Sequence, residues 1–328
     1  MTKDNIFKKG VRAIKEGRIN LLLFGILYYL ISLKNKTIEE LKYDLIKFIK
    51  KGEIYNKIIV NDSSMYVDLK DKGISKELSV HKKRERFSTE FVKKIIKTKD
   101  IIIDIGANIG YYALLEARLA KKGKIYAIEP IPKNNKLLNE NVKLNKYKNI
   151  SIFQYAIGDK NEIGIMNISD KCNWSSFTKN PNTKVLEEIK VPLITLDKFI
   201  EKNVKKNPSL IRMDVEGYEC QILKGMKKML KEGKPLKIFM ELHPYWLGLM
   251  SREDMKELIN TLKKNNFKIK AIITEVAPYN YKDIKLINWL RKLFKLPKFG
   301  IIGKSYEELE NLLRNEDIYT PQIFFERK

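Results

Sequence analysis

Apolar runs and amphipathic stretches alternate along the chain from Asp100 onward. Continuous apolar runs are typical of buried strands in a parallel sheet, and apolar residues spaced three and four apart are typical of helices. The runs predict strands at 101–105, 124–130, 149–157, 209–215, 235–244, 267–273 and 321–327. The amphipathic stretches predict helices at 109–122, 133–146, 193–202, 217–233 and 251–265. This alternation predicts a doubly wound α/β fold with a mostly parallel, seven-stranded sheet.

Two segments lie outside this alternation. Residues 1–75 predict an N-terminal extension of helices and a short strand pair, which occupies 57–69 and turns at residues 61–64. Residues 278–320 predict a helical insertion before the last strand. We therefore divide the chain into the extension and a main domain, residues 76–328.

Two apolar segments raise the question of membrane contact. Residues 19–33 form an uncharged run with a basic residue on either side, shorter than the roughly 20 residues that span a bilayer. Within 285–303, Trp and Phe lie on one helical face and Lys and Arg on the other. Each segment fits either a helix packed on the main domain or an amphipathic anchor at a membrane surface. Cys172 and Cys220 form no disulfide or metal pattern, so we expect a cytoplasmic protein, with the inner face of the membrane as the alternative.

The chain has 328 residues, 44% of them hydrophobic, and a formal net charge of +25. Such a charge suits an anionic partner such as RNA, because phosphate neutralisation dominates nucleic-acid binding. However, only 10 of the 65 basic residues are Arg, the better phosphate ligand, and the Lys residues are spread along the whole sequence. We therefore interpret most of the charge as solvated surface and keep RNA as the less favoured partner.

The stretch DIGANIGYY, which begins at Asp104, is a glycine-bearing turn between a predicted strand and a predicted helix. The dinucleotide pattern G-x-G-x-x-G, counted from Gly106, meets Asn108 and Tyr111 where it requires glycine, which disfavours a pyrophosphate ligand. Backbone N–H groups at the start of a helix attract a carboxylate, and Asp104 would attract an amino group. Gly106 and Gly110 therefore shape a turn that suits the amino-acid end of a cofactor.

The next predicted strand ends in Glu129, followed by Pro130. An acid at the tip of the second strand can accept both hydroxyl groups of a ribose. A glycine turn and a strand-end acid on consecutive strands together predict S-adenosylmethionine as the cofactor.

A second cluster of polar residues follows two later strands. Asp214 and Glu216 come after the fourth strand, and Glu241 and His243 come at the end of the fifth. Because the carboxyl ends of parallel strands meet at one edge of the sheet, we expect these groups to lie together. His243, neutral at pH 7, is the expected base for removing a hydroxyl proton, with Asp214 and Glu216 as further catalytic residues.

Two alternatives to catalysis stay open for these groups. The acids could serve simply to cap the following helix. The four groups could also hold Mg²⁺ or Mn²⁺, although no metal signature is present and we predict no metal. CNWSSF, residues 172–177, fits either a wall of the acceptor pocket or a plain loop.

Several further motifs occur in a characteristic order. They are IIDIGANIGYY (102–112), YAIEP (126–130), QYAIGD (154–159), ITLDKF (194–199), IRMDVEGYECQILKG (211–225) and FMELHP (239–244), with GISKEL (73–78) and RERF (84–87) upstream. In this order they resemble the FkbM-type methyltransferases over roughly Lys70 to Leu242. The resemblance implies a class I methyltransferase (Rossmann-like) fold that uses S-adenosylmethionine, usually on a hydroxyl oxygen.

Carried onto this chain, the resemblance also implies roles for individual residues. The methionine end of the cofactor would contact Asp104, Gly106, Asn108 and Gly110, and Glu129 would bind the ribose. Ala156 and Ile157 would flank the adenine.

The sequence thus predicts an S-adenosylmethionine-dependent O-methyltransferase for a sugar, lipid-linked or small-molecule acceptor. One alternative is an RNA methyltransferase, although the Asn-Pro-Pro-aromatic loop typical of amino-methylating enzymes is absent after the fourth strand. The other alternative is a membrane-associated binding protein that keeps the fold without catalysis.

Overall fold

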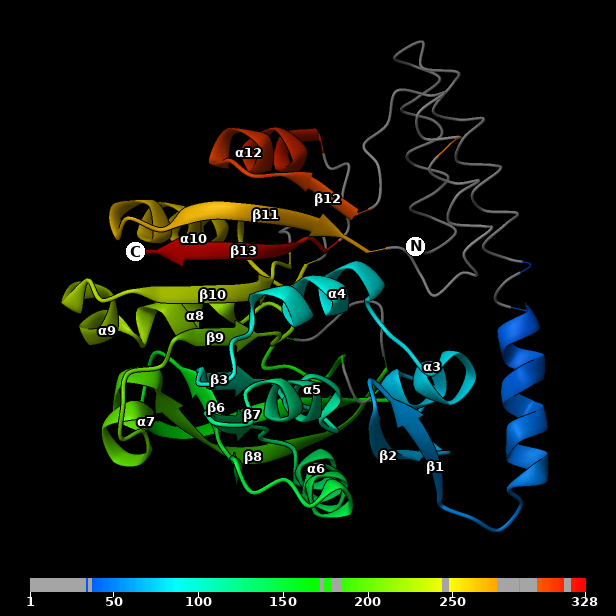
Figure 1. Ribbon diagram of the computed structural model, residues 1–328. Helices are drawn as coiled ribbons and strands as arrows, with labels where there is room; N and C mark the ends of the chain where they lie inside the picture. The colour runs from blue at the N-terminus through cyan, green and yellow to red at the C-terminus, as the bar shows by residue number, and fades with distance from the viewer. Residues whose placement is uncertain are drawn as a thin grey trace.

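The computed structural model of the chain describes residues 34, 37–171, 174–178, 184–243, 248–275, 289, 300–315 and 320–328. Its largest element is an eight-stranded sheet (Figure 1). In spatial order its strands are β12 (Gly300–Gly303), β11 (Lys268–Thr274), β13 (Gln322–Arg327), β10 (Leu236–Glu241), β9 (Leu210–Met213), β3 (Ile101–Ile105), β4 (Lys124–Ile128) and β5 (Ile150–Phe153). Neighbouring strands are parallel from β10 to β5, whereas β13 runs antiparallel to β10 and β11, and β12 antiparallel to β11.

The order of the strands reverses at the centre of the sheet. From β3 the chain builds β4 and β5 on one side, then returns to place β9 against the other side of β3 and β10 beyond it. At such a reversal the carboxyl ends of the two central strands leave a crevice in which α/β proteins bind ligands. This topology confirms the predicted class I methyltransferase fold with all seven expected strands. The eighth strand, β12, is an addition from the 278–320 insertion, where we had expected only helix.

A smaller, three-stranded sheet contains parts of the predicted strand 149–157 and of the predicted helix 193–202. The expected strand 149–157 divides into β5 and β6 (Ala156–Gly158), and β6 pairs with β8 (Val185–Thr195), which also pairs with β7 (Glu162–Ser169). The expected helix 193–202 therefore begins later, as α7 (Leu196–Asn203). Its first three expected residues pair with β6, and the Thr195 hydroxyl accepts the Lys198 N–H as the helix N-cap.

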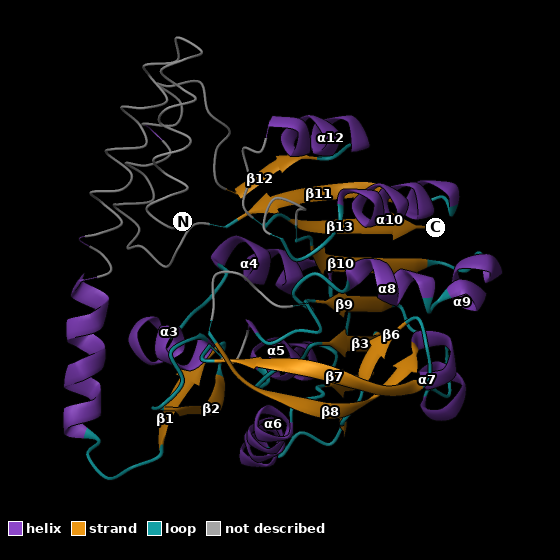
Figure 2. Ribbon diagram, turned by 180° about the vertical axis from the view of Figure 1, so that it is seen from behind, coloured by secondary structure: helices purple, strands orange, loops and turns teal. Residues whose placement is uncertain are grey.

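Helices cover both faces of the large sheet, and each face has its own hydrophobic core. One face carries α3 (Ile74–His81), α4 (Arg86–Ile95), α5 (Tyr111–Leu119) and α6 (Pro132–Asn145). The other carries α7, α8 (Glu219–Lys224), α9 (Lys227–Glu232), α10 (Arg252–Lys264) and α12 (Tyr306–Asn315). Figure 1 shows α4 and α5 in front of the sheet, and Figure 2 shows α8 and α10 in front from the opposite side.

The predicted strand pair of the N-terminal extension is present as β1 (Tyr55–Val60) and β2 (Ser63–Asp68). Asn61 and Asp62 turn the chain with φ values of 49° and 60°, as two-residue hairpin turns require. The hairpin packs into the same core as α5 and α6. Asn141 of α6 is fully buried and bonds both backbone groups of Tyr66 in β2 and the carbonyl of Ile109 before α5.

The two segments discussed for membrane contact lie mostly outside the described residues. None of residues 19–33 is described, and of 285–303 only Trp289 and β12 are. Within the described part of the chain, every helix is too short or too polar to span a bilayer.

Replacement of Asn141 by Ala tests the hairpin attachment. The change leaves buried backbone groups of Tyr66 and Ile109 without partners, so we expect the free energy of unfolding to fall by about 3 kcal/mol. Glu140→Ala, an exposed change on the same helix, should cost less than about 0.5 kcal/mol. Urea unfolding of both variants measures the difference, and equal midpoints would refute the attachment.

Candidate active site

The turn after β3 is shaped by two glycines with backbone conformations that side chains disfavour. Gly106 has φ of 80°, and a Cβ atom there would lie 2.1 Å from the backbone oxygen of Asp214. Gly110 has φ of 99°, and a Cβ atom there would lie 2.7 Å from Leu138 Cδ1. Only glycine meets both requirements. The contact between Gly106 and Asp214 brings together the turns that follow β3 and β9.

Glu129 lies directly after β4 and joins this turn. Its buried carboxylate accepts the Asn108 N–H at 2.9 Å and the Ile131 N–H at 3.0 Å. Burial raises the pKa of Glu129 to about 7, although these hydrogen bonds act in the opposite direction. The carboxylate is therefore fixed in place and changes its charge near neutral pH.

These elements line one pocket at the carboxyl edge of the sheet. It contains about 540 Å³ of space, including the part open to solvent. The predicted site residues that line it are Gly106, Asn108, Glu129, Ala156, Ile157, Asp214 and Glu216. The other predicted residues, Asp104, Gly110 and His243, lie behind this lining.

Most of the other lining residues had no predicted role in the site. They are Ile105, Pro130, Ile131, Asn134, Tyr155, Met166, Val215 and Tyr218, whereas Ser175 and Phe177 belong to the stretch 172–177 discussed above. The rings of Phe177 and Tyr218 pack with their centroids 4.7 Å apart, and the Ser176 hydroxyl donates to the carbonyl of Glu216 at 2.8 Å. Ser175 and Phe177 of the stretch 172–177 thus contribute to the pocket wall, which supports one of the two interpretations left open. Tyr218 had a signal in the sequence, since an aromatic residue there directly follows the acidic cluster.

Asp104 lies beneath the pocket, fully buried. Its Oδ1 accepts from the guanidinium of Arg212 at 3.0 Å, and its Oδ2 has no partner among the described residues. Arg212 also donates to Asp214 at 3.1 Å, and its guanidinium carbon lies 3.9 Å from the centre of the Tyr112 ring. The sequence did signal Arg212, as the one charged residue within the apolar run LIRM, but we had assigned it no role.

His243 sits between two carboxylates. Its Nδ1 lies 2.7 Å from Glu219 Oε1 and its Nε2 lies 3.3 Å from Glu216 Oε2. Burial alone would lower the pKa of His243, but Glu219 and Glu216 together raise it well above the usual value. The raised pKa favours an imidazolium, which would not accept a proton, over the neutral imidazole that we had expected. Glu216, which lines the pocket, is the better-placed acceptor, and burial raises its pKa too.

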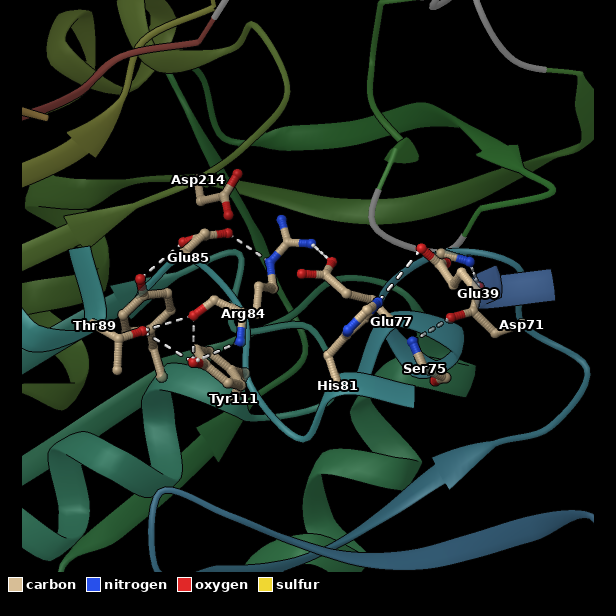
Figure 3. A network of polar contacts seen from close by, with 12 residues as sticks. Glu39, Asp71, Ser75, Glu77, His81, Arg84, Glu85, Thr89, Tyr111 and Asp214 are labelled. Atoms are coloured by element: carbon tan, nitrogen blue, oxygen red, sulfur yellow. Dashed lines mark hydrogen bonds and ion pairs between the residues drawn. The ribbon is translucent and has the colours of Figure 1, made fainter. Parts of the chain in front are cut away.

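Further charges surround Asp214. Burial would raise its pKa, but Arg212, His243 and Arg84 lower it, so Asp214 is ionised. Burial and the charge of Asp214 raise the pKa of Glu241 well above its usual range, which favours its neutral form. Figure 3 shows Arg84, from the upstream RERF motif, between Glu77 and Glu85 on the side of Asp214.

Two groups of side chains here have the spacing of a metal site. Asp214, Glu216 and His243 each offer a ligand atom within 4.8 Å of the others, and so do Glu85, Asp214 and Glu241. Asp214, which belongs to both groups, is already paired with the guanidinium of Arg212. We assign no metal to either group.

Comparison with known proteins identifies a matching family. The sequence model of the FkbM methyltransferase domain matches residues 104–269, about half of the chain. A hexuronic acid methyltransferase of Haloferax volcanii is 27% identical over 134 residues, which are 40% of this chain and 52% of that protein. A tRNA(Phe) (4-demethylwyosine(37)-C(7)) aminocarboxypropyltransferase of Methanocaldococcus jannaschii is 30% identical over 77 residues, which are 24% of this chain and 30% of that protein. Each alignment thus spans about half or less of the curated relative.

Among solved structures, M. jannaschii TYW2 in complex with AdoMet matches 84% of this chain and 86% of its own, with a TM-score of 0.40 and 13% sequence identity.

The raised pKa of Glu129 predicts how cofactor binding depends on pH. If the ionised carboxylate accepts the ribose hydroxyls, the ionised fraction and the affinity for S-adenosylhomocysteine fall as the pH falls through about 7. Between pH 8 and pH 6 we expect roughly tenfold weaker binding by titration calorimetry. Glu129→Gln removes the titrating group, so its weaker binding should vary much less over this range. An equal pH dependence in both proteins would contradict the assignment.

Proposed function

The chain belongs to the FkbM methyltransferase family, a family that uses S-adenosylmethionine, and from this we propose that it methylates a hydroxyl oxygen of a sugar, lipid-linked or small-molecule acceptor. The cofactor supplies a methyl group on a positively charged sulfur. The proposal adds the type of acceptor atom and the residues that carry out the reaction.

The geometry of the pocket suits this cofactor. Gly106 and Asn108 place backbone where the methionine end would bind, and the fixed carboxylate of Glu129 faces the space for a ribose. Ala156 and Ile157 line the part proposed for the adenine. Asp104 and Gly110 would act from behind the lining, Asp104 through Arg212 and Gly110 through the shape of the turn.

The observation that carries the hydroxyl assignment is the position of Glu216. Its carboxylate lines the cofactor pocket and lies against the imidazolium of His243. Transfer of a methyl group to a hydroxyl requires the oxygen to be aligned with the methyl carbon and its proton to be removed. Glu216 would take that proton, His243 would hold Glu216, and Asp214 would complete the charge around the reacting atoms.

One of the relatives supports a sugar as the acceptor. The relative from H. volcanii is named for a hexuronic acid, and a sugar offers several hydroxyl groups. RNA is the second candidate, favoured by the net charge of +25 and by the tRNA-modifying relative.

Isotopically labelled S-adenosylmethionine tests the function. Incubated with cell extract, the purified protein should transfer label to oxygen atoms of a glycan or small molecule, as mass spectrometry of the products would reveal. Glu216→Gln should lower kcat roughly 100-fold or more while leaving S-adenosylhomocysteine affinity within about threefold. Glu187→Gln, an exposed change on β8, serves as the matched control. Label found only on RNA bases would reject the hydroxyl acceptor.

Contact with the inner face of a membrane, through residues 19–33 and 285–303, is part of the same proposal. The whole chain should then co-sediment with anionic liposomes, because amphipathic basic segments bind such surfaces. Deletion of residues 1–36 or 283–300 should weaken the binding. Recovery of the full chain in the supernatant would remove the membrane from the proposal.

A further inference from the structure

Glu216, His243 and Glu219 form a line of three ionisable groups that leads from the pocket into the core. Glu216 lies in the loop between β9 and α8, Glu219 begins α8, and His243 follows β10. Only Glu216 lines the pocket. His243 is 2% exposed and Glu219 is fully buried, so neither can exchange protons directly with bulk water.

The two carboxylate oxygens of Glu219 differ in their hydrogen bonds. Its Oε1 accepts from His243 Nδ1 at 2.7 Å and from the Gly217 N–H at 3.3 Å. Its Oε2 has no hydrogen-bond partner among the described residues. A buried carboxylate is costly unless a positive charge compensates it. Within this line of groups, an imidazolium on His243 would supply that charge.

We propose that Glu219 is a positioning residue, whose carboxylate keeps His243 protonated on both nitrogens and directed at Glu216, so that Glu216 receives the proton of the acceptor hydroxyl. This inference rests on the proposed function and adds a residue that acts through two others. It also gives Glu219 a role that its place at the start of a helix alone would not.

The bonds and protons that change in the reaction explain why Glu216 and His243 have different roles. As the hydroxyl oxygen bonds to the methyl carbon, the carbon–sulfur bond breaks with its electron pair left on sulfur, and the hydroxyl proton passes to an Oε atom of Glu216. The proton later leaves Glu216 to water through the pocket. His243 keeps both of its protons throughout, because its charge stays paired with Glu219.

The groups that face His243 are consistent with a permanent imidazolium. Glu216 and Glu219 bond its ring nitrogens, Asp214 contributes a negative charge from the end of β9, and Glu241 contributes a neutral carboxyl from the end of β10. The nearest competing arrangement is a divalent ion bound by Asp214, Glu216 and Nε2 of His243, with Glu219 still holding Nδ1. The two arrangements differ in whether Nε2 carries a proton.

Nitrogen NMR of the full-length protein distinguishes them. The chain has two histidines, so a sample labelled with ¹⁵N in its imidazoles gives two sets of signals, and His81→Gln assigns them. We expect both His243 nitrogens to stay protonated from pH 6 to pH 8.5. In Glu219→Gln we expect His243 to titrate within this range. A neutral His243 in the unaltered protein, or an Nε2 signal that shifts with MgCl₂ and returns with EDTA, would overturn the proposal.

Kinetics test the same residue through its effect on turnover. Glu219→Gln should lower kcat about tenfold or more, leave the KM for S-adenosylmethionine within about threefold, and move the alkaline limb of the kcat profile to lower pH. In a His243→Gln background the same change should have little further effect, because Glu219 acts through His243. Additive losses, or an unshifted pH profile, would contradict the proposal.

Two controls distinguish a loss of folding from a loss of the proposed interaction. Glu253→Gln removes an exposed carboxylate from α10 and should change neither the NMR signals nor kcat. Affinity for S-adenosylhomocysteine reports whether Glu219→Gln is folded, and Glu219→Asp keeps the charge if the amide variant is not. If no methyl transfer is found with any acceptor, the proposed function fails, while the NMR result still decides the state of His243.

Discussion

The buried guanidinium of Arg212 is the interaction on which the candidate site depends. It lies in the central strand β9 and binds Asp104 of β3 on one side and Asp214 on the other. Burial alone would lower the pKa of Arg212, but Asp104 and Asp214 raise it, so the group stays charged. Removing one member of a buried ion pair typically costs about 3–5 kcal/mol, because the partner is left without compensation. The strands on both sides of the reversal in the sheet are therefore joined by charge as well as by backbone hydrogen bonds.

The rest of the local charge is arranged around this group. Glu116 of α5 is fully buried, and burial and the nearby Asp104 raise its pKa well above the usual range, so it adds no negative charge. Glu241 is neutral for a similar reason on the opposite side. Three of the other carboxyl groups contact a cationic side chain: Asp214 pairs with Arg212, Glu77 with Arg84 and Glu216 with His243. In each pair the positive charge acts to lower the pKa of the carboxyl group that it contacts.

Much of the fold could be predicted from the sequence, because it depends on local patterns. Apolar runs such as 101–105 and glycine turns such as that at Gly106 are readable from neighbouring residues alone. The division of 149–157 could not be predicted, since it depends on the pairing of β6 with β8, in which Ala156 lies opposite Leu193, 37 positions later. β12 was not predicted for the same reason, since its four residues form a strand by pairing with β11.

The candidate site, too, could be predicted only in part from the sequence. Glu129, Asp214 and Glu216 could be placed at one edge because each follows a parallel strand, and the structure gathers them around one pocket. The charge of His243 could not be predicted, because it depends on Glu219, 24 positions earlier in the chain. The two meet only because β9 and β10 pair in parallel. Sequence patterns located the groups, whereas their protonation states required the three-dimensional contacts.

Asn141 links the N-terminal hairpin to the segment that begins α5, through Tyr66 on one side and Ile109 on the other. We expect a hairpin and a turn that share one buried amide to open as one cooperative unit. The hairpin amides should then exchange with solvent only as fast as this unit opens. A ligand bound at the turn should therefore slow hydrogen exchange in β1 and β2, although neither strand lines the pocket. The predicted boundary at residue 75 thus separates two sequence patterns. The residues on its two sides would nevertheless contribute to the stability of one unit.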